Sequence, residues 1–232
     1  MSLAENISHI KGRIAAAARA AGRSPDGITL VAATKTQTSE TIRAAIAAGV
    51  TVCGENRVQE LTAHLKDNAY EGASLHFIGH LQTNKVKYVV GAVDLIESVS
   101  SLRLLQAISD QAVKIGVVQD VLLEINVGRE EAKSGFLPEE LTAAVQAAAS
   151  LPGVRLRGLM AIPPIAEEPG ANTPYFVEMS HLLVDTRHIL GDNVSDIDSL
   201  SMGMSGDFED AVAAGATLVR VGTAIFGARV PR

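Results

Sequence analysis

The sequence predicts a single (β/α)8 barrel, in which a closed parallel sheet is surrounded by helices. Eight short runs of β-branched and apolar residues alternate with longer, alanine-rich runs of helical period, which is typical of βα units around a parallel sheet. The chain has 232 residues, enough for one such barrel with a full hydrophobic core. We therefore expect residues 1–232 to form one α/β domain, with an open doubly wound sheet as the second interpretation.

Composition and charge exclude several classes of protein. The chain has 20 Lys and Arg against 26 Asp and Glu, a net charge of −6, which argues against nucleic acid as the main partner. Aromatic residues are 3% of the chain, so few side chains can stack on unpaired bases. No apolar run approaches the roughly 18 residues that cross a bilayer, so we expect no membrane partner. The only cysteine, Cys53, cannot form an internal disulfide, which favours the reducing cytoplasm.

An extra helix is predicted before the barrel, between Leu3 and Ala21. In that segment Leu3, Ile7, Ile10 and Ile14 recur every three to four residues and therefore share one helical face. This periodicity favours a packed helix over a mitochondrial transit peptide, the alternative that the arginines of this region raise.

The elements of the barrel follow in order. The eight predicted strands cover residues 28–33, 50–53, 75–79, 95–99, 117–127, 156–162, 194–202 and 218–226. The helices between them cover residues 39–48, 56–68, 82–90, 101–114, 138–150, 175–190 and 207–214. Gly49 and Gly215 each follow a helical run, as glycines that end helices do. Residues 163–174 contain four prolines and are predicted to form an irregular loop.

A lysine follows the first predicted strand. In barrel enzymes, the catalytic and binding residues lie at the carboxyl ends of the strands, so this lysine is a candidate site residue. Lys35 follows this strand and shares the side-chain parity of Val31 and Ala33. If those two residues face the interior, the Lys35 amine lies among apolar neighbours, which favour the neutral form that attacks a carbonyl. A solvated lysine is the alternative.

The segment after the seventh strand, residues 201–206, has the features of an anion site. It carries two glycines and Ser205 just before a helix, and loops in this part of a barrel frequently bind phosphate. Asp207 and Glu209 would repel a dianion unless they point outward. A capped helix without a ligand is the alternative.

The eighth strand carries a charge. Alternation sends Arg220 and Gly222 to one face, and if that face is the interior, Arg220 is a buried cation that needs an acceptor. A bound ligand is one candidate acceptor. Glu97 and Glu124, at neighbouring strand ends, are the others.

Together, a lysine at one strand end, an arginine in the last strand and a glycine-rich anion site resemble the pyridoxal-phosphate site of the alanine racemase barrel. The chain is still more similar to the small, single-domain pyridoxal phosphate homeostasis (YggS-like) family. The resemblance runs from the first strand to the end of the chain, and it is carried by VAATK at 31–35, CGENRVQE at 53–60, HFIGHLQTNK at 76–85, RGLM at 157–160, LSMGMS at 200–205 and VRVGTAIFG at 219–227.

The resemblance implies a TIM barrel of the alanine racemase N-terminal type that binds pyridoxal 5'-phosphate. It implies that Lys35 forms the internal aldimine and that Arg220 faces the pyridine nitrogen. The other implied contacts are uncharged: Ser205, Gly222 and Thr223 at the phosphate, and Asn56 and Met202 beside the ring. His80 has two interpretations, one at the cofactor face and one as a packed residue after the third strand.

The expected function is binding rather than robust catalysis. A guanidinium stays protonated, so Arg220 would donate to the ring nitrogen and leave it neutral, which weakens the cofactor as an electron sink. Alanine racemases also carry a further β domain with a second catalytic base, and this chain ends soon after the eighth strand. We expect a role in intracellular vitamin B6 and amino-acid homeostasis, with a low-activity amino-acid racemase as the alternative.

Several minor expectations complete the interpretation. PLP-requiring apoenzymes are candidate partners, and the chain is expected to be a monomer or a weak dimer. Lys133 lies in a charged loop and is predicted to be solvated, with a second, reversible cofactor adduct as the alternative. Cys53 is predicted to be buried packing. The six histidines lack metal-ligand spacing, so no metal is expected.

Overall fold

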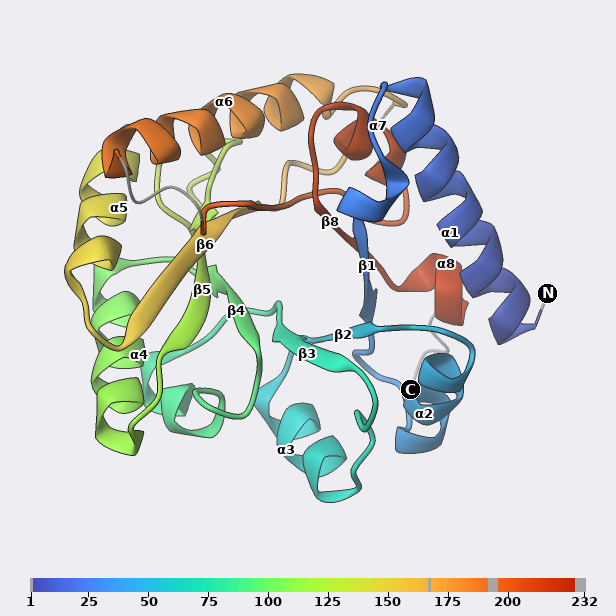
Figure 1. Cartoon of the computed structure of the whole chain (residues 1–232), viewed down its shortest axis with the longest axis horizontal. Coiled ribbons are helices and arrows are strands. Elements are labelled where there is room, and N and C mark those ends of the chain that lie inside the picture. Colours follow the sequence, from blue (N-terminus) through green and yellow to red (C-terminus); the bar gives the residue numbers. More distant parts are fainter. Residues whose placement is uncertain (1, 167, 192–195, 228–232) are drawn as a thin grey trace.

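The chain folds into a closed barrel of eight parallel strands. A computed structural model describes residues 2–166, 168–191 and 196–227. Neighbouring strands pair in chain order from β1 to β8, and β8 pairs with β1 to close the sheet. Helices form a ring around it (Figure 1). The predicted (β/α)8 barrel is therefore confirmed, and the doubly wound sheet is excluded.

The strands are short, and most lie close to the predicted positions. Their bounds are β1 Thr29–Ala33, β2 Val52–Glu55, β3 Ser74–Phe77, β4 Leu95–Val99, β5 Gln119–Ile125, β6 Val154–Ala161, β7 Ser199–Ser201 and β8 Leu218–Val221. The predicted seventh strand, 194–202, lies partly outside the described residues, and β7 is shorter than predicted within them.

The helices occupy the segments between the strands. They are α1 Leu3–Ala20, α2 Ser39–Ala47, α3 Val58–Lys66, α4 Leu102–Ile115, α5 Leu141–Ser150, α6 Thr173–Leu190, α7 Phe208–Ala213 and α8 Thr223–Phe226. Three 3-10 turns add to them, at η1 Pro25–Gly27, η2 Thr83–Tyr88 and η3 Pro138–Glu140. The predicted helix at 82–90 is thus the 3-10 turn η2.

The end of the chain corrects one prediction. The eighth strand was expected to reach residue 226, but β8 stops at Val221 and residues 223–226 form the short helix α8. Either a strand or a short helix would bury the apolar residues of this segment. Over so few residues, the periodicity of apolar positions does not distinguish a buried helix from a strand. Gly222 makes the turn between them.

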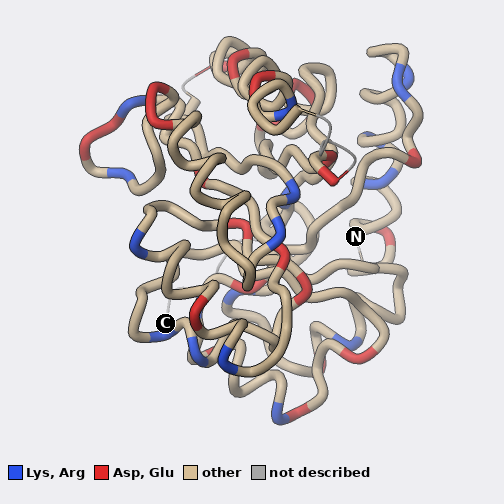
Figure 2. Tube along the Cα trace, turned by 60° about the vertical axis from the view of Figure 1, so that its left-hand side comes forward, with Lys and Arg blue, Asp and Glu red and all other residues tan. Residues whose placement is uncertain are grey.

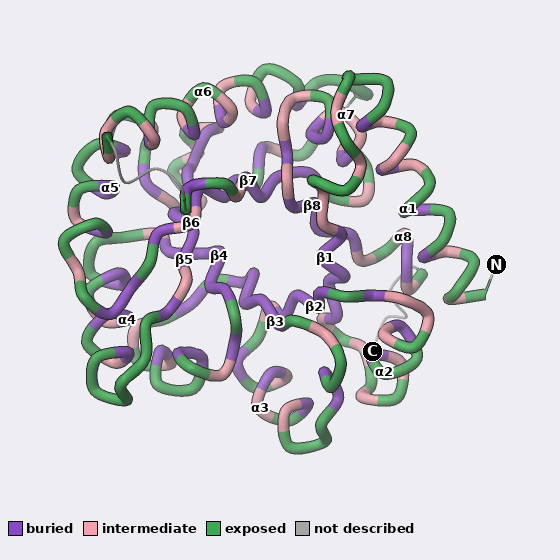
Figure 3. The backbone as a smooth tube through the Cα atoms, in the orientation of Figure 1, coloured by how far each residue is buried: buried purple, intermediate pink, exposed green. Residues whose placement is uncertain are grey.

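The strands are largely buried, as Figure 3 shows, and their apolar side chains divide between one cluster inside the barrel and a larger one against the helices. Val31 and Ala33 belong to the small interior cluster, together with side chains such as Leu95 and Leu218. This confirms the parity on which the expectations for β1 and β8 depend. By the same alternation, the polar side chains of Glu97 and Arg220 also point inward.

Helix α1 closes the outer ring beside β1, as Figure 1 shows. Its buried face consists of Ile7, Ile10, Ile14 and Ala18, close to the predicted set, and it packs against α7 and α8. The packed helix is therefore confirmed. None of the described helices is long and apolar enough to cross a membrane, and acidic and basic residues are interspersed along the trace (Figure 2).

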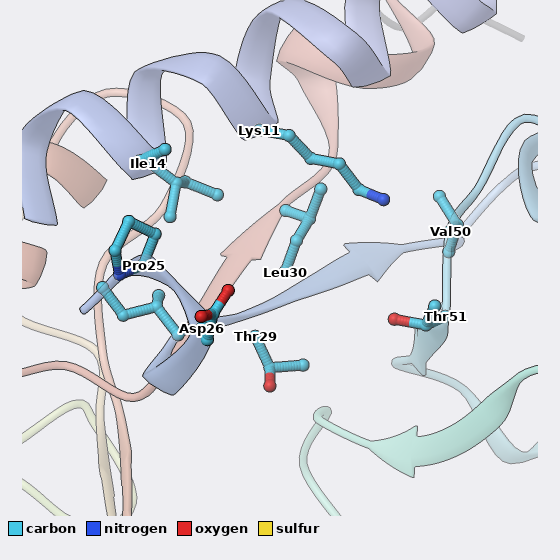
Figure 4. A pocket seen from close by; sticks show the side chains of 10 residues that line it. Lys11, Ile14, Pro25, Asp26, Thr29, Leu30, Val50 and Thr51 are labelled. Carbon is cyan, nitrogen blue, oxygen red and sulfur yellow. The ribbon is translucent and has the colours of Figure 1, made fainter.

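A cavity of about 280 Å³ lies beneath α1, where β1 and β2 begin. Figure 4 shows Lys11, Asp26 and Thr29 among its lining residues. The Lys11 amine donates to the carbonyl of Gly49 at 2.6 Å, which ties α1 to the turn before β2. Because this end of a barrel usually serves stability, a functional site is expected at the opposite end.

Candidate functional site

The mouth of the barrel, where the strands have their carboxyl ends, carries Lys35 on a strained turn. Lys35 lies two residues beyond β1 and is half-buried. The next residue, Thr36, has a φ of 67°, in the left-handed region that β-branched residues rarely adopt. Its amide donates to the Glu60 carboxylate at 2.7 Å, which holds the turn in place. Backbone strain of this kind clusters at functional sites.

A buried group of polar side chains supports this turn from outside the barrel wall. We call Thr34, Glu55, His64 and Tyr70 the outer network. Tyr70 donates its hydroxyl to Glu55 at 3.0 Å, and the Thr34 hydroxyl lies 3.4 Å from the same carboxylate oxygen. His64 contacts the Tyr70 hydroxyl at 3.1 Å. The outer network therefore joins the ends of β1 and β2 to α3.

Burial dominates the electrostatics of the outer network. Glu55 is fully buried, and this raises the pKa of its carboxyl although the Asn56 amide and the Tyr70 hydroxyl both donate to it. Burial and the nearby Glu55 also raise the pKa of the Tyr70 phenol. These partners carry dipoles rather than full positive charges. The network is therefore a buried scaffold in which hydroxyl and amide groups donate to one carboxylate.

Asn56 leaves β2 at the same level as Lys35 leaves β1, since Ala33 pairs with Gly54 in the sheet. Its backbone amide donates to Glu55 at 2.7 Å, which fixes the main chain. Its side-chain oxygen is buried without a hydrogen-bond partner. A buried acceptor of this kind is costly, so a donor from a ligand would stabilise it.

Arg220 lies inside the barrel, as alternation predicted, and it is only 5% exposed. Nη1 donates to the Ser201 hydroxyl and Nη2 donates to the Ala161 carbonyl at 2.8 Å. Nη1 lies 3.8 Å from a carboxylate oxygen of Glu97. The protein partner of the buried cation is therefore Glu97, one of the two acidic residues that the sequence left open.

The polar contacts of Arg220 extend further into the barrel. Ser201 donates to Glu97 Oε2 at 2.6 Å, and His76 Nδ1 lies 2.7 Å from Glu97 Oε1. We call His76, Glu97, Ser201 and Arg220 the inner network. Burial alone would raise the pKa of the Glu97 carboxyl, but the His76 hydrogen bond and the charges of His76 and Arg220 hold it below its ordinary value. Glu97 is therefore an ionised, fully buried carboxylate.

The predicted anion loop has the geometry of a close backbone approach. Gly203 has a φ of 89°, and a Cβ there would meet the Cβ of Ala211 at 2.5 Å, so only glycine fits. The Ser205 hydroxyl lies 3.5 Å from the amide of Ala224, which brings the loop after β7 beside the start of α8. Ser205, Gly222 and Thr223 thus meet at one edge of the mouth.

The two acidic residues of this segment are committed to other partners. Asp207 accepts from the Met204 amide at 2.7 Å and from the Asn172 side chain at 2.8 Å. Glu209 forms a paired interaction with Arg13 of α1, at 2.7 Å and 2.8 Å. These contacts therefore reduce the repulsion that Asp207 and Glu209 were predicted to exert on a bound dianion.

Met202 is placed differently from the other predicted residues. Its side chain is 0% exposed and belongs to the outer apolar core, between the strands and the helices. It therefore supports the anion loop from beneath and offers no surface to a ligand. Cys53 is also buried, which raises the pKa of its thiol to about 12 and fits the predicted packing role.

A cavity of about 410 Å³ opens at the mouth between the ends of β3, β5 and β6. His80 is exposed and lines it, so this histidine faces the mouth rather than packing beneath it. Glu124 lines the same cavity, and burial raises the pKa of its carboxyl. One carboxyl oxygen of Glu124 accepts from Ser134 at 3.2 Å, and the other is buried without a partner. The sequence had marked Glu124 only as a partner for Arg220.

Lys133 also borders this cavity. It forms an ion pair with Glu130 and donates to the carbonyl of Pro163 at 3.1 Å. It is only half-exposed, and it joins the loop after β5 to the proline-rich loop after β6. The predicted solvated loop lysine is thus a bridge between two loops.

Comparisons with known proteins agree with this fold. The profile of the family described as alanine racemase, N-terminal domain, matches residues 5–230. The pyridoxal phosphate homeostasis protein of Aquifex aeolicus (strain VF5) is 44% identical over 232 residues and is covered to 99%, as is this chain. An unknown protein from Bifidobacterium adolescentis has a solved structure with a TM-score of 0.91 and 39% identity, covering 97% of this chain and 94% of that one. PipY of Synechococcus elongatus PCC7942, solved with PLP bound, has a TM-score of 0.81 and 29% identity, covering 97% and 100%.

Proposed function

This chain belongs to the alanine racemase N-terminal domain family, and from that premise we propose that it binds pyridoxal 5'-phosphate at the barrel mouth and serves vitamin B6 homeostasis. Relatives at this level of identity carry the homeostasis name, and one neighbour was solved with the cofactor. The observation that carries the proposal most directly is the meeting of an amine, a buried guanidinium and a glycine-rich loop at one end of the barrel. The amine follows β1 and the guanidinium lies in β8, and these two strands are adjacent, since Val31 pairs with Arg220.

The residues of the mouth fit the chemical groups of this cofactor. A phosphate requires hydroxyl and amide donors, which Ser205, Gly222 and Thr223 supply at one edge. A Cβ at Gly222 would lie 3.3 Å from Ala33, so glycine lets the turn before α8 lie close to the end of β1. The unpartnered oxygen of Asn56 accepts from a polar substituent of the ring. Met202, which is fully buried in the outer apolar core, is proposed to support the loop rather than to contact the ring.

Lys35 is proposed to hold the cofactor covalently. Its unprotonated amine adds to the aldehyde, a C=N bond replaces the C=O bond, and the oxygen leaves as water. When bound, the cofactor supplies this aldehyde and a conjugated ring that withdraws electrons. The strained turn at Thr36 fixes the direction in which the lysine leaves β1.

Arg220 is proposed to donate a hydrogen bond to the ring nitrogen. Burial lowers the pKa of its guanidinium, while the charges of Glu97 and Glu124 oppose that shift. A guanidinium remains protonated at neutral pH, so it has a hydrogen to donate but no lone pair with which to accept one. The ring nitrogen facing it stays unprotonated, which favours holding the cofactor over catalysing carbanion chemistry. Transfer to PLP-requiring apoenzymes and an influence on amino-acid pools are further parts of this proposal.

Visible absorption spectroscopy of the purified protein tests the proposed binding. We expect the protein incubated with PLP to show imine absorbance that persists through gel filtration. Lys35→Ala should lose this absorbance and keep its circular dichroism spectrum, because an amine in a turn contributes little packing. The matched control is Lys133→Ala, a second lysine at the mouth, which should keep the absorbance. Imine absorbance that survives in Lys35→Ala would reject Lys35.

The same samples separate binding from racemisation. With L-alanine present, a holding protein should produce no D-alanine at steady turnover. Sustained production of D-alanine that depends on Lys35 would favour the low-activity racemase instead.

A further inference from the structure

The inner network connects the mouth of the barrel to its opposite end. At one end, Arg220 lies at the level of the proposed ring site. At the other end, His76 lines a cavity of about 250 Å³ formed where the strands begin. Ser201 and Glu97 lie between them, and each contact from Nη1 of Arg220 to His76 is a hydrogen bond. The barrel is therefore crossed by a continuous chain of polar side chains.

The direction of each hydrogen bond in this chain is fixed by chemistry. Arg220 can only donate, so the Ser201 oxygen accepts from it. The single hydroxyl hydrogen of Ser201 is then directed to Glu97. An ionised Glu97 can only accept, so His76 carries a hydrogen on Nδ1 in both of its protonation states. A proton that binds to or leaves His76 therefore does so at Nε2.

Several charged groups surround His76 besides Glu97. Asp94, Asp120 and Arg157 line the same cavity. Asp120 is paired with Arg155 at 2.6 Å and with Arg157 at 3.5 Å, and Asp94 accepts the Leu75 amide at 2.8 Å. These acidic groups therefore have partners of their own, whereas Glu97 is shared between His76 and Arg220.

We propose that Glu97 and Ser201 are positioning residues for Arg220, and that His76 makes the hydrogen bond donated by Arg220 at the mouth respond to proton binding at the other end of the barrel. With His76 neutral, the charge of Glu97 balances that of Arg220 alone. With His76 protonated, Glu97 divides its charge between two cations, and the field at the mouth becomes more positive. A more positive potential beside the ring nitrogen disfavours its protonation, so the ring nitrogen stays unprotonated more strongly.

This proposal rests on the proposed function only for the identity of the ligand at the mouth. Its first test needs no ligand. The 15N NMR signal of Arg220 Nε in the protein without PLP should shift with pH as His76 gains or loses its proton. His76→Gln should abolish this shift. The matched control is His64→Gln, because His64 is also buried and bonded near a buried glutamate but belongs to the outer network.

The second test uses the protein loaded with PLP. The absorption and fluorescence of the bound cofactor should change over the same pH range in the wild type and in His64→Gln, and should lose that change in His76→Gln. Ser201→Ala and Glu97→Gln should alter the cofactor spectrum at every pH. Ser201→Ala removes only one hydroxyl, so it remains informative if Glu97→Gln does not fold.

The outcomes separate the two proposals. An Arg220 signal that titrates in the same way in His76→Gln and in the wild type would overturn the coupling, whatever binds at the mouth. An unchanged cofactor spectrum in folded Ser201→Ala would overturn the positioning role. A protein that binds no PLP but whose Arg220 signal follows His76 would support the coupling and reject the proposed function.

Discussion

Two fully buried glutamates, Glu97 inside the barrel and Glu55 outside it, have opposite electrostatic properties. Both accept several hydrogen bonds, and neither is exposed to solvent. The pKa of Glu55 is raised because burial outweighs its dipolar donors, whereas the pKa of Glu97 is lowered because His76 and Arg220 outweigh burial. The number of hydrogen bonds alone therefore does not decide the direction of the shift, and Glu97 differs from Glu55 in having the His76 hydrogen bond and the charge of Arg220 beside it.

The difference also separates scaffold from site. The outer network joins β1, β2 and α3, and the groups that donate hydrogen bonds to its glutamate are the Tyr70 hydroxyl and the Asn56 amide. The inner network concentrates charge beneath the mouth, where an apolar core would be the more stable solution. A cost in stability at that position is expected where a ligand must meet a fixed cation.

The largest expected effect comes from breaking the inner network. Glu97→Ala leaves Arg220 buried without its counter-charge and should lower the free energy of unfolding by about 3 to 5 kcal/mol. Glu55→Gln, which resembles a neutral glutamic acid, should cost about 0.5 to 1.5 kcal/mol. Urea denaturation of both variants measures the two values. Equal losses would contradict the contrast between the networks.

The next effect concerns the ligand rather than the fold. Ser205→Ala should weaken PLP binding by about 1.5 to 3 kcal/mol, since one hydrogen bond to a charged phosphate is lost. Pyridoxal without its phosphate should bind more weakly still, and the two proteins should bind it equally. Equilibrium dialysis gives all four affinities. If Ser205→Ala binds PLP as tightly as the parent does, the phosphate lies elsewhere.

Removal of one hydroxyl from each network tests whether only the inner network affects the bound ligand. Tyr70→Phe should cost about 1 kcal/mol of stability and leave the spectrum of bound PLP unchanged, because its hydroxyl serves only the outer network. Ser201→Ala should change that spectrum. Thermal unfolding and absorption of the loaded variants provide the two readouts. A spectral change in Tyr70→Phe would show that the networks are not separate.

The smallest expected effect is the pH dependence of stability. Glu97, with a lowered folded pKa, contributes stability above the ordinary glutamate value of 4.5 and loses it as pH falls through the folded pKa. Glu55, with a raised folded pKa, contributes stability below 4.5 and loses it as pH rises through the folded pKa. Between pH 4.5 and neutrality, the Glu55 carboxyl should therefore make the parent protein less stable as pH rises. Glu55→Gln should lack this contribution to the decline. Denaturation at several pH values measures these slopes, and parallel curves for Glu55→Gln and the parent would refute the raised pKa.

Much of the fold could be predicted from the sequence because barrels repeat one local pattern. Period-two alternation in β1 and β8 was sufficient to place Val31 and Arg220 in the interior. The short helix α8 was missed because its apolar residues follow β8 directly, and only the turn at Gly222 separates them.

The site was predicted less completely, for reasons that are geometric. Sequence shows that Arg220 needs an acceptor, but the choice between Glu97 and Glu124 depends on distances across the barrel. Ser201 and His76 share the inward parity and could have been found by listing every inward polar residue. The outer network depends on a tyrosine and a histidine near α3 that fold back on Glu55, and no short spacing shows such contacts.

Chemical trapping of the bound cofactor tests whether the mouth holds PLP through Lys35. The protein is incubated with PLP, reduced with borohydride to make the C–N bond permanent, digested, and analysed by peptide mass spectrometry. We expect one principal modified peptide, carrying the pyridoxyl group on Lys35, and no modification of that peptide in Lys35→Ala. A reduced adduct mainly on another lysine, or no adduct under conditions that saturate binding, would contradict this expectation.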